Sequence, residues 1–206
     1  MVFLQDSTST YVKICGLMDE ECLDVAIGSG ADAIGFVFAP NSPRQISREL
    51  ADRLTTQLPQ DVLAVAVVQN YGSLSDFNDW NGWLQLCGDE DEQLVESSPC
   101  PVIRAFKWNQ QSLLRWDACP HVQALLVDGS SGGTGEAFDI SELTNLLPSI
   151  TKPVIIAGGL TPSNVSEVIK TAQPAGVDVS SGVESERGVK DPTKICAFIN
   201  AVKDLQ

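Results

Sequence analysis

Short runs of apolar residues recur along the chain, and the segments between them place apolar residues at helical spacing. Eight runs begin 19 to 31 residues apart, and within each run the apolar positions are continuous rather than alternating. A continuous run is typical of a parallel strand that is covered on both sides. The sequence therefore predicts eight strands, over residues 11–15, 33–38, 62–68, 83–87, 102–107, 122–128, 153–159 and 175–181.

The intervening segments carry signals for where helices start and stop. Residues 19–29 place their apolar side chains on one face, and a helix from Ser47 repeats leucine every fourth residue until Pro59 ends it. Thr161-Pro162 and Asp191-Pro192 each pair a capping side chain with proline at the first helical position. The sequence therefore predicts a helix at each of these four places.

Three further segments give weaker or different signals. Asp139 followed by Glu142 resembles a capping box at the start of a helix. Residues 73–80 have only a short helical pattern, so we expect an irregular connection there. The acidic run at residues 89–92 predicts a solvated helix start, where carboxylates interact favourably with the helix dipole.

Strands that alternate with helices eight times fit two architectures, an open doubly wound sheet and a closed (β/α)8 TIM barrel. A dinucleotide-binding sheet carries G-x-G-x-x-G after its first strand, and Cys15-Gly16-Leu17 does not match that pattern. Eight repeats of similar length without an interior linker favour the barrel. We expect a short N-terminal tail over residues 1–10 and one barrel domain over residues 11–206.

Composition narrows the class of protein and its partners. The chain has 206 residues, of which 43% are apolar, so it is long enough to bury a sizeable core. Its 27 acidic and 13 basic residues give a net charge of −14, which argues against nucleic acid and anionic membranes as partners. The chain has no run of about 18 apolar residues and no signal-peptide pattern, so we expect a cytoplasmic protein.

Six cysteines and a single histidine limit the chemistry that the chain can perform. The cysteines have no C-x-x-C spacing and several fall in apolar runs, so we expect free thiols, no disulfide framework and no bound metal. His121 precedes the sixth strand, which is the end of a barrel opposite to its active site. Proton transfer is therefore expected to use carboxyl and thiol groups.

In a (β/α)8 barrel the active site lies at the carboxyl ends of the strands. The polar residues that end or follow the predicted strands are therefore the candidates for chemistry. They are Cys15, Arg44, Gln85, Cys87, Arg104, Lys107, Asp128, Asp178, Ser180 and Ser181.

Glycines follow the last two predicted strands. Loops at these places form the recurrent phosphate site of the fold, because glycine lets backbone N–H groups approach an anion closely. A tight turn alone would also use a glycine pair. We favour the phosphate site, because two such loops follow adjacent strands, and we assign it to Gly158, Gly159, Ser180, Ser181 and Gly182.

Taken in order along the chain, several motifs resemble those of the phosphoribosylanthranilate isomerases of tryptophan biosynthesis, a family of ribulose-phosphate-binding barrels. The resemblance extends from Val12 to about Leu205. It rests on residues 12–16 (VKICG), 30–38 (GADAIGFVF), 42–47 (SPRQIS), 126–128 (LVD), 132–135 (GGTG), 157–160 (AGGL) with Pro162 and Asn164, and 177–184 (VDVSSGVE).

The resemblance implies an isomerase that needs no cofactor. Its substrate would be N-(5′-phosphoribosyl)anthranilate and its product 1-(2-carboxyphenylamino)-1-deoxyribulose 5-phosphate, formed by an Amadori rearrangement. By this resemblance Asp128 is the general acid that protonates the furanose ring oxygen. Cys15 is the general base that removes the proton from C2′, and Arg44 is a candidate to pair with the anthranilate carboxylate. Neighbouring enzymes of the tryptophan pathway are candidate protein partners.

Four further residues are expected to contact the substrate. Gln85 and Asp178 lie at strand ends, and Asp178 would orient Arg44 or substrate hydroxyls, although a purely structural role is about as reasonable. Gly133 and Gly135 belong to a glycine-rich segment that is either a lid and clamp over the substrate or a long surface turn.

A thiol has an ordinary pKa near 8.5, so it needs a positive or polar environment to act as a base near neutral pH. Our hypothesis is that Arg44 and nearby backbone dipoles favour the Cys15 thiolate. A carboxylic acid that donates a proton needs its pKa raised, and we expect the bound substrate to desolvate Asp128.

Two departures from the family pattern keep other functions open. The family usually has histidine where this chain has Cys87, and the third strand ends differently, at Gln69-Asn70. The related ribonucleotide isomerase of histidine biosynthesis would need aspartate at position 15. Indole-glycerol-phosphate synthase would need a catalytic lysine, and Lys13 also points inward by strand alternation. A barrel that binds a phosphosugar without turning it over is a further alternative.

Overall fold

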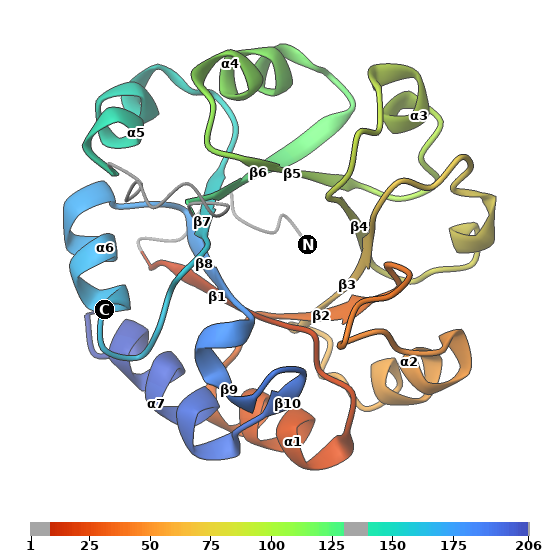
Figure 1. The fold of residues 1–206 in the computed structure, drawn as a ribbon, viewed down its shortest axis with the longest axis vertical. Coiled ribbons are helices and arrows are strands. Elements are labelled where there is room, and N and C mark those ends of the chain that lie inside the picture. Colours follow the sequence, from red (N-terminus) through yellow and green to blue (C-terminus); the bar gives the residue numbers. More distant parts are fainter. Residues whose placement is uncertain (1–8, 130–139, 206) are drawn as a thin grey trace.

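All eight predicted strands are present, and they close into a parallel barrel (Figure 1). The computed structural model describes residues 9–129 and 140–205. Neighbouring strands pair in chain order and β8 pairs with β1, which establishes the TIM barrel and excludes the open sheet. The strands are β1 (Tyr11–Cys15), β2 (Ala33–Val37), β3 (Leu63–Val68), β4 (Trp83–Leu86), β5 (Val102–Lys107), β6 (Val122–Asp128), β7 (Val154–Ala157) and β8 (Gly176–Val179).

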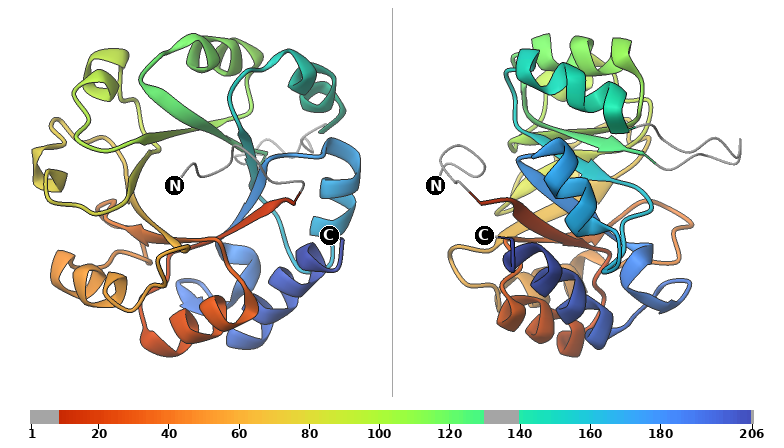
Figure 2. Two further views of the ribbon diagram at one scale, coloured as in Figure 1. Left: turned by 180° about the vertical axis from the view of Figure 1, so that it is seen from behind. Right: turned by 90° about the vertical axis from the view of Figure 1, so that its left-hand side faces the viewer.

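Helices form a ring outside the barrel (Figure 2). Because each crossover from one parallel strand to the next runs over the outer face, the helices cover that face and bury it. Within the described ranges, none of them is long and apolar enough to cross a membrane. They are α1 (Glu20–Ser29), α2 (Arg48–Thr55), α3 (Glu92–Glu96), α4 (Gln110–Ala118), α5 (Ile140–Leu146), α6 (Val165–Ala172) and α7 (Pro192–Lys203).

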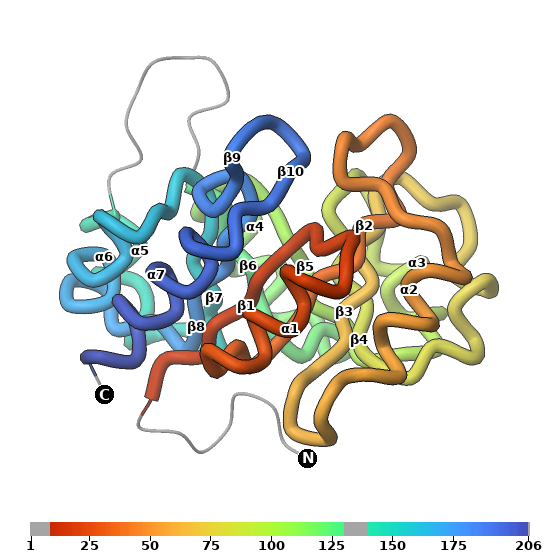
Figure 3. The backbone as a smooth tube through the Cα atoms, turned by 90° about the horizontal axis from the view of Figure 1, so that it is seen from below, coloured from red at the N-terminus to blue at the C-terminus, as the bar shows by residue number. Residues whose placement is uncertain are grey.

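Short elements complete the connections. A 3-10 helix, η1 (Ser75–Phe77), lies in the segment that was predicted to be irregular, and η2 (Leu147–Ser149) follows α5. After β8 come η3 (Ser181–Val183) and a hairpin of β9 (Glu184–Glu186) and β10 (Val189–Lys190). Figure 3 shows this hairpin at one end of the barrel and the start of β1 at the opposite end.

Two predicted helix starts have different outcomes. Asp191 caps α7 as expected, because its side chain accepts hydrogen bonds from the first-turn backbone and Pro192 is the first helical residue. The predicted start at Thr161 is wrong, since α6 begins at Val165. The backbone N–H of Thr161 donates to Asn164 Oδ1 at 2.8 Å, so an asparagine-stabilised turn precedes the helix.

The helix that follows β2 starts where predicted but ends early. Ser47 caps α2, its Oγ accepting from the backbone N–H of Leu50 at 3.2 Å. The helix ends at Thr55, and the next residues before Pro59 form tighter turns with i to i−3 hydrogen bonds. Asp139, the expected cap of α5, lies outside the described residues.

Strand alternation divides the core into two layers. Residues such as Ile103 and Ala105 of β5 face the barrel interior, where alanine and valine predominate. Their neighbours face the helices and join a larger cluster of leucine, isoleucine and aromatic side chains. The interior layer is rich in small residues, which leaves room for functional side chains on the inward face.

The six cysteines are all free, and His121 is exposed, 3.7 Å from Glu96, at the N-terminal end of β6. Both observations agree with the sequence predictions. The free thiols include Cys15, which lies at the carboxyl end of β1 with only 6% of its surface exposed.

The acidic run at residues 89–92 was predicted to be a solvated helix start, and α3 does begin there, capped by Asp91. The prediction is wrong for Glu90, because its side chain is completely buried. Its carboxylate accepts hydrogen bonds from the backbone N–H groups of Asn70, at 2.6 Å, and Gly88, at 2.7 Å. Arg104 Nη1 lies 3.4 Å from the same carboxylate. Asn70 and Gly88 follow the ends of β3 and β4, and Arg104 lies within β5, so Glu90 links three neighbouring strands.

We predict that Glu90→Gln lowers the free energy of unfolding by roughly 3 kcal/mol, since breaking a buried ion pair leaves Arg104 without its compensating charge. Chemical unfolding at neutral pH measures this loss. Asp89→Asn is the matched control, because Asp89 is exposed and its side chain should contribute less than about 0.5 kcal/mol. Equal effects of the two substitutions would contradict the buried-pair interpretation.

Candidate active site

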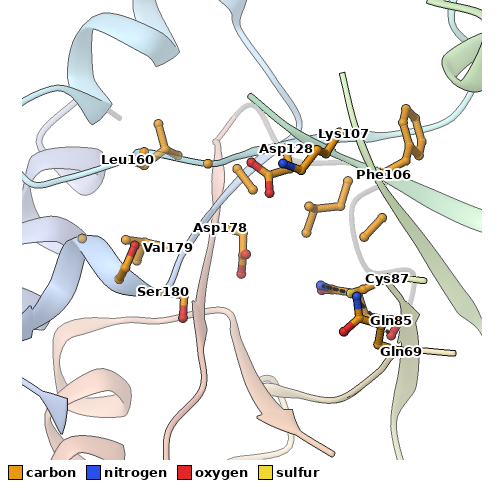
Figure 4. A pocket seen from close by; sticks show the side chains of 17 residues that line it. Gln69, Gln85, Cys87, Phe106, Lys107, Asp128, Leu160, Asp178, Val179 and Ser180 are labelled. Atoms are coloured by element: carbon orange, nitrogen blue, oxygen red, sulfur yellow. Dashed lines mark hydrogen bonds between the residues drawn. The ribbon is translucent and has the colours of Figure 1, made fainter. Parts of the chain in front are cut away.

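A cavity of about 390 Å³ opens where the strands end, at the mouth of the barrel (Figure 4). Eight residues predicted to form the site line it: Gln85, Asp128, Gly158, Gly159, Asp178, Ser180, Ser181 and Gly182. Its other lining residues are Gln69, Cys87, Ala105, Phe106, Lys107, Leu126, Ala157, Leu160 and Val179.

Two of the predicted site residues that the structure describes are outside this lining. Cys15 and Arg44 lie on the β1 and β2 side of the mouth, where the side chain of Arg44 passes over Gly16. Gly133 and Gly135 are outside the described residues, so their expected contact with the substrate has no structural account.

The loops after β7 and β8 form one side of the cavity. Gly158 and Gly159 have φ angles of 86° and 68°, a left-handed conformation that other residues rarely adopt. A Cβ atom at Gly182 would lie 1.8 Å from the carbonyl oxygen of Leu160. Glycine is therefore required for the two loops to meet backbone to backbone beside the cavity.

Lys13 and Asp178 form an ion pair inside the barrel, on neighbouring strands and at the same register position. Lys13 Nζ donates to Asp178 Oδ1 at 2.7 Å, and only 3% and 9% of the two side chains are exposed. Of the roles expected for Asp178, orienting Arg44 is not what the structure shows, because Asp178 pairs with Lys13 and Arg44 pairs with Glu184. A role toward substrate hydroxyls and a purely structural role both stay predictions. The inward position of Lys13 on β1 is confirmed.

Cys15 lies next to this ion pair. Burial raises the pKa of its thiol, and Lys13 gives the largest opposing effect. Asp178 raises the pKa further and Lys190 lowers it. The sequence hypothesis assigned the favourable charge to Arg44, but the dominant cation is Lys13.

Arg44 is held by Glu184, which starts the hairpin after β8. Arg44 Nε and Nη2 donate to the two carboxylate oxygens at 2.5 and 2.9 Å, a bidentate pair. The same carboxylate accepts from Lys190 Nζ at 3.0 Å and from the backbone N–H of Gly188 at 3.1 Å. Burial raises the pKa of Glu184, but these donors outweigh it and lower the pKa to about 2.

Lys190 connects this carboxylate to the predicted phosphate loop. Its Nζ donates to the carbonyl oxygen of Ser180 at 2.8 Å, and only 1% of its side chain is exposed. Ser180 Oγ in turn donates to the carbonyl oxygen of Cys15 at 3.1 Å. One hydrogen-bonded network therefore joins Arg44, the loop after β8 and the end of β1.

Asp128 ends β6 and is half-buried at the edge of the cavity, with its carboxylate directed inward (Figure 4). Lys107, its register partner on β5, also lines the cavity. The carboxyl group therefore has access both to solvent and to a bound ligand. Such a position suits a group that delivers a proton.

The β4 side of the cavity carries an amide and a thiol. Gln85 Nε2 donates to Cys87 Sγ at 3.2 Å, whereas the buried Gln85 Oε1 has no hydrogen-bond partner among the described residues. A buried acceptor without a partner is available to a donor on a ligand. Burial raises the pKa of Cys87 to about 12, so this thiol is neutral near pH 7.

Reasoning from strand ends missed Glu184 and Lys190, which follow β8 by several residues. The only sequence signal was that Glu184 ends the motif at residues 177–184. Gly35 was also missed, although a Cβ there would lie 2.9 Å from Cys15 Sγ and 3.1 Å from Lys13 Nζ. Glycine at this position of β2 thus makes room for both side chains.

Comparison with known families and sequences gives a consistent result. Residues 12–201 match the family model for N-(5′-phosphoribosyl)anthranilate (PRA) isomerase. An N-(5′-phosphoribosyl)anthranilate isomerase of Pseudomonas fluorescens is 41% identical over 93% of this chain and 97% of its own. One from Chromohalobacter salexigens is 39% identical, with 96% of each chain covered.

Solved structures agree with the sequence matches. A phosphoribosyl anthranilate isomerase from Thermus thermophilus superposes with a TM-score of 0.84 and 34% identity, covering 96% of this chain and 100% of its own. Another such isomerase, in complex with reduced 1-(o-carboxyphenylamino)-1-deoxyribulose 5-phosphate, gives a TM-score of 0.81 at 34% identity, over 95% and 99% of the two chains.

We predict that Glu184→Gln lowers stability at neutral pH and changes its dependence on acid. A carboxyl group whose folded pKa is about 2 adds stability above its unfolded pKa of about 4.3, and this stability is lost as pH falls toward 2. Unfolding free energies measured from pH 7 to 2 should therefore fall less steeply in the variant. Glu186→Gln, on the exposed part of β9, is the control. If both variants keep the parental slope, Glu184 does not have the assigned pairing.

Proposed function

This chain belongs to the N-(5′-phosphoribosyl)anthranilate isomerase family, and we propose that it catalyses the Amadori rearrangement of that compound in tryptophan biosynthesis. The product is 1-(2-carboxyphenylamino)-1-deoxyribulose 5-phosphate. One observation about this chain supports the assignment most directly. Asp128 ends β6 and Cys15 ends β1, and the two glycine-containing loops of the intervening β7 and β8 lie between them.

The loops after β7 and β8 are the proposed anchor for the phosphate of the substrate. The loops carrying Gly158, Gly159 and Gly182 supply close backbone approach, and Ser181 adds a hydroxyl group. The hydroxyl of Ser180 already donates to the carbonyl oxygen of Cys15, so Ser180 would contribute through its backbone. A phosphate held there positions the attached ribose between the end of β6 and the end of β1. The sugar ring is then within reach of a carboxyl group on one side and a thiol on the other.

Arg44 is the proposed partner of the anthranilate carboxylate. Its guanidinium has five N–H donors, and the paired carboxylate of Glu184 engages Nε and Nη2. The remaining donors are available on a side chain that is 21% exposed beside Cys15. Because Glu184 fixes the plane of the guanidinium, Arg44 would meet the substrate without first losing conformational freedom.

The first chemical step is ring opening. Asp128 donates its proton to the furanose oxygen, the bond between that oxygen and C1′ breaks, and the anthranilate nitrogen supplies the electron pair that forms a protonated Schiff base. The freed hydroxyl keeps the proton, and Asp128 becomes a carboxylate. General acid catalysis of this kind contributes about 10²- to 10⁴-fold to the rate.

The second step transfers a proton from carbon. Cys15, as a thiolate, removes the C2′ proton, and the electrons of that C–H bond move to the Schiff base to give an enolamine. The enolamine then tautomerises to the ketone, with a proton lost from the C2′ hydroxyl and one gained at C1′. Cys15 needs to be ionised before this step, so the charges around its sulfur determine how much of the reactive thiolate is present.

The departure at Cys87 is compatible with these roles. Its raised pKa of about 12 keeps the thiol neutral, and Gln85 donates to its sulfur. Cys87 directly follows β4 and lines the same cavity as Asp128, but neither proposed proton-transfer step uses it. We infer that it contributes to the wall of the anthranilate and sugar site.

We also propose a cytoplasmic location, which the six free cysteines support, since thiols stay reduced in that compartment. Neighbouring enzymes of the tryptophan pathway are the proposed protein partners. The surplus of acidic residues argues against nucleic acid.

Turnover of phosphoribosylanthranilate generated in situ tests the proposal, with loss of substrate fluorescence as the signal. The parent protein should be active, and Cys15→Ser and Asp128→Asn should each lower kcat by about 10²- to 10⁴-fold, the contribution of a general base or acid. Cys196→Ser and Asp24→Asn are matched controls, because Cys196 lies on α7 and Asp24 is exposed on α1.

Two outcomes would contradict the proposal. A parent that binds a product analogue but does not turn over would indicate a non-catalytic barrel. If either site variant retained the parental kcat, the acid or base role of that residue would be wrong, while the family assignment would stand.

A further inference from the structure

A lysine side chain inside the barrel needs a physical explanation. Lys13 is 2% exposed, and removing an ammonium group from water is costly unless a counter-charge accompanies it. Asp178 provides that charge at 2.7 Å. An apolar pair would fill the same space without this cost, so the charge itself calls for a function.

Lys13 and Cys15 are adjacent inward-facing positions on β1. A Cβ atom added to Gly35, the register partner of Cys15, would lie 2.9 Å from the sulfur and 3.1 Å from the ammonium nitrogen. Because both distances are measured from the same Cβ position, Cys15 Sγ and Lys13 Nζ cannot be more than about 6 Å apart. At that separation, in the partly buried interior, a full charge acts strongly on the ionisation of a thiol.

We propose that Lys13 is a positioning residue for the isomerase reaction, in which its ammonium, held by Asp178, stabilises the thiolate form of Cys15. This inference rests on the proposed role of Cys15 as the base. Lys13 acts through Cys15 and is not itself assigned a contact with the substrate. Asp178 compensates the buried charge of the lysine.

Other charged and titratable groups around Cys15 have smaller or opposing effects. Lys13 lowers the pKa of Cys15 more than Asp178 raises it, and Lys190, on β10, lowers it less. Arg44, from the loop after β2, and Cys87, at the end of β4, also interact with Cys15. Among all the groups that act on Cys15, the dominant cation is therefore Lys13, which lies on the same strand, β1.

The two members of the ion pair therefore have opposite effects on the same thiol. Removing the positive charge should disfavour the thiolate, whereas removing the negative charge should favour it. A purely structural ion pair would give no such opposition, because losing either partner would simply loosen the barrel.

The experiment measures the rate at which iodoacetamide alkylates Cys15 as a function of pH, with the modified peptide identified by mass spectrometry. Lys13→Met should raise the pH midpoint of alkylation by about one to two units, the size expected for a charge at this distance. Asp178→Asn should lower the midpoint. Lys13→Arg, which keeps the charge, should stay closer to the parent than Lys13→Met does.

Two further variants keep the test decisive. Lys13→Met alone leaves the buried carboxylate of Asp178 unpaired, and an unpaired buried charge can by itself prevent folding. The double variant Lys13→Met with Asp178→Asn removes both charges and therefore leaves no unpaired buried charge. Its midpoint should still lie above that of the parent, since Lys13 is the stronger influence. Lys170→Met, on the exposed face of α6, is the control and should leave the midpoint unchanged.

Two results would overturn this inference. One is an unchanged midpoint in both Lys13→Met and the double variant. The other is a shift of the same sign in Lys13→Met and Asp178→Asn. Turnover of Cys15→Ser separates it from the proposed function. If Cys15→Ser is inactive and the midpoints do not move, only the role of Lys13 is wrong. If Cys15→Ser is fully active, the base assignment fails first.

Discussion

Closure of the eight-stranded barrel is the constraint on which the site depends. Once β8 pairs with β1, residues that are 165 positions apart in the chain become neighbours on one inner surface, as Lys13 and Asp178 are. The same closure puts β6, which carries the proposed acid, and β1, which carries the proposed base, on either side of the β7 and β8 loops. The order of strands thus fixes which chemical group meets which part of a phosphorylated sugar.

The distribution of charge follows from the same geometry. The chain carries a net charge of −14, yet three of its cations, Lys13, Arg44 and Lys190, gather near the β1 end of the site. Each is paired with a buried or partly buried carboxylate, from Asp178 or Glu184. The pairing holds the cations in fixed positions beside a site that we propose takes a substrate with a phosphate and a carboxylate. The excess of negative charge therefore lies on the rest of the molecule.

Much of the fold, but less of the site, could be predicted from the sequence. Continuous apolar runs located all eight strands within a few residues, because burial on both faces leaves a strong local pattern. Thr161 and Glu90 were misjudged because their behaviour depends on contacts made in the fold, an asparagine turn in one case and two neighbouring loops in the other. The bidentate hold of Glu184 on Arg44 spans 140 positions, so no local signal could reveal it.

The most direct test is a crystal structure of this protein with reduced 1-(o-carboxyphenylamino)-1-deoxyribulose 5-phosphate, the ligand of a solved relative. Our account predicts the phosphate against the Gly158–Gly159 and Ser181–Gly182 loops, the carboxylate at Arg44, and C2′ facing Cys15. A phosphate bound at Arg44, or a C2′ atom turned away from Cys15, would contradict the account.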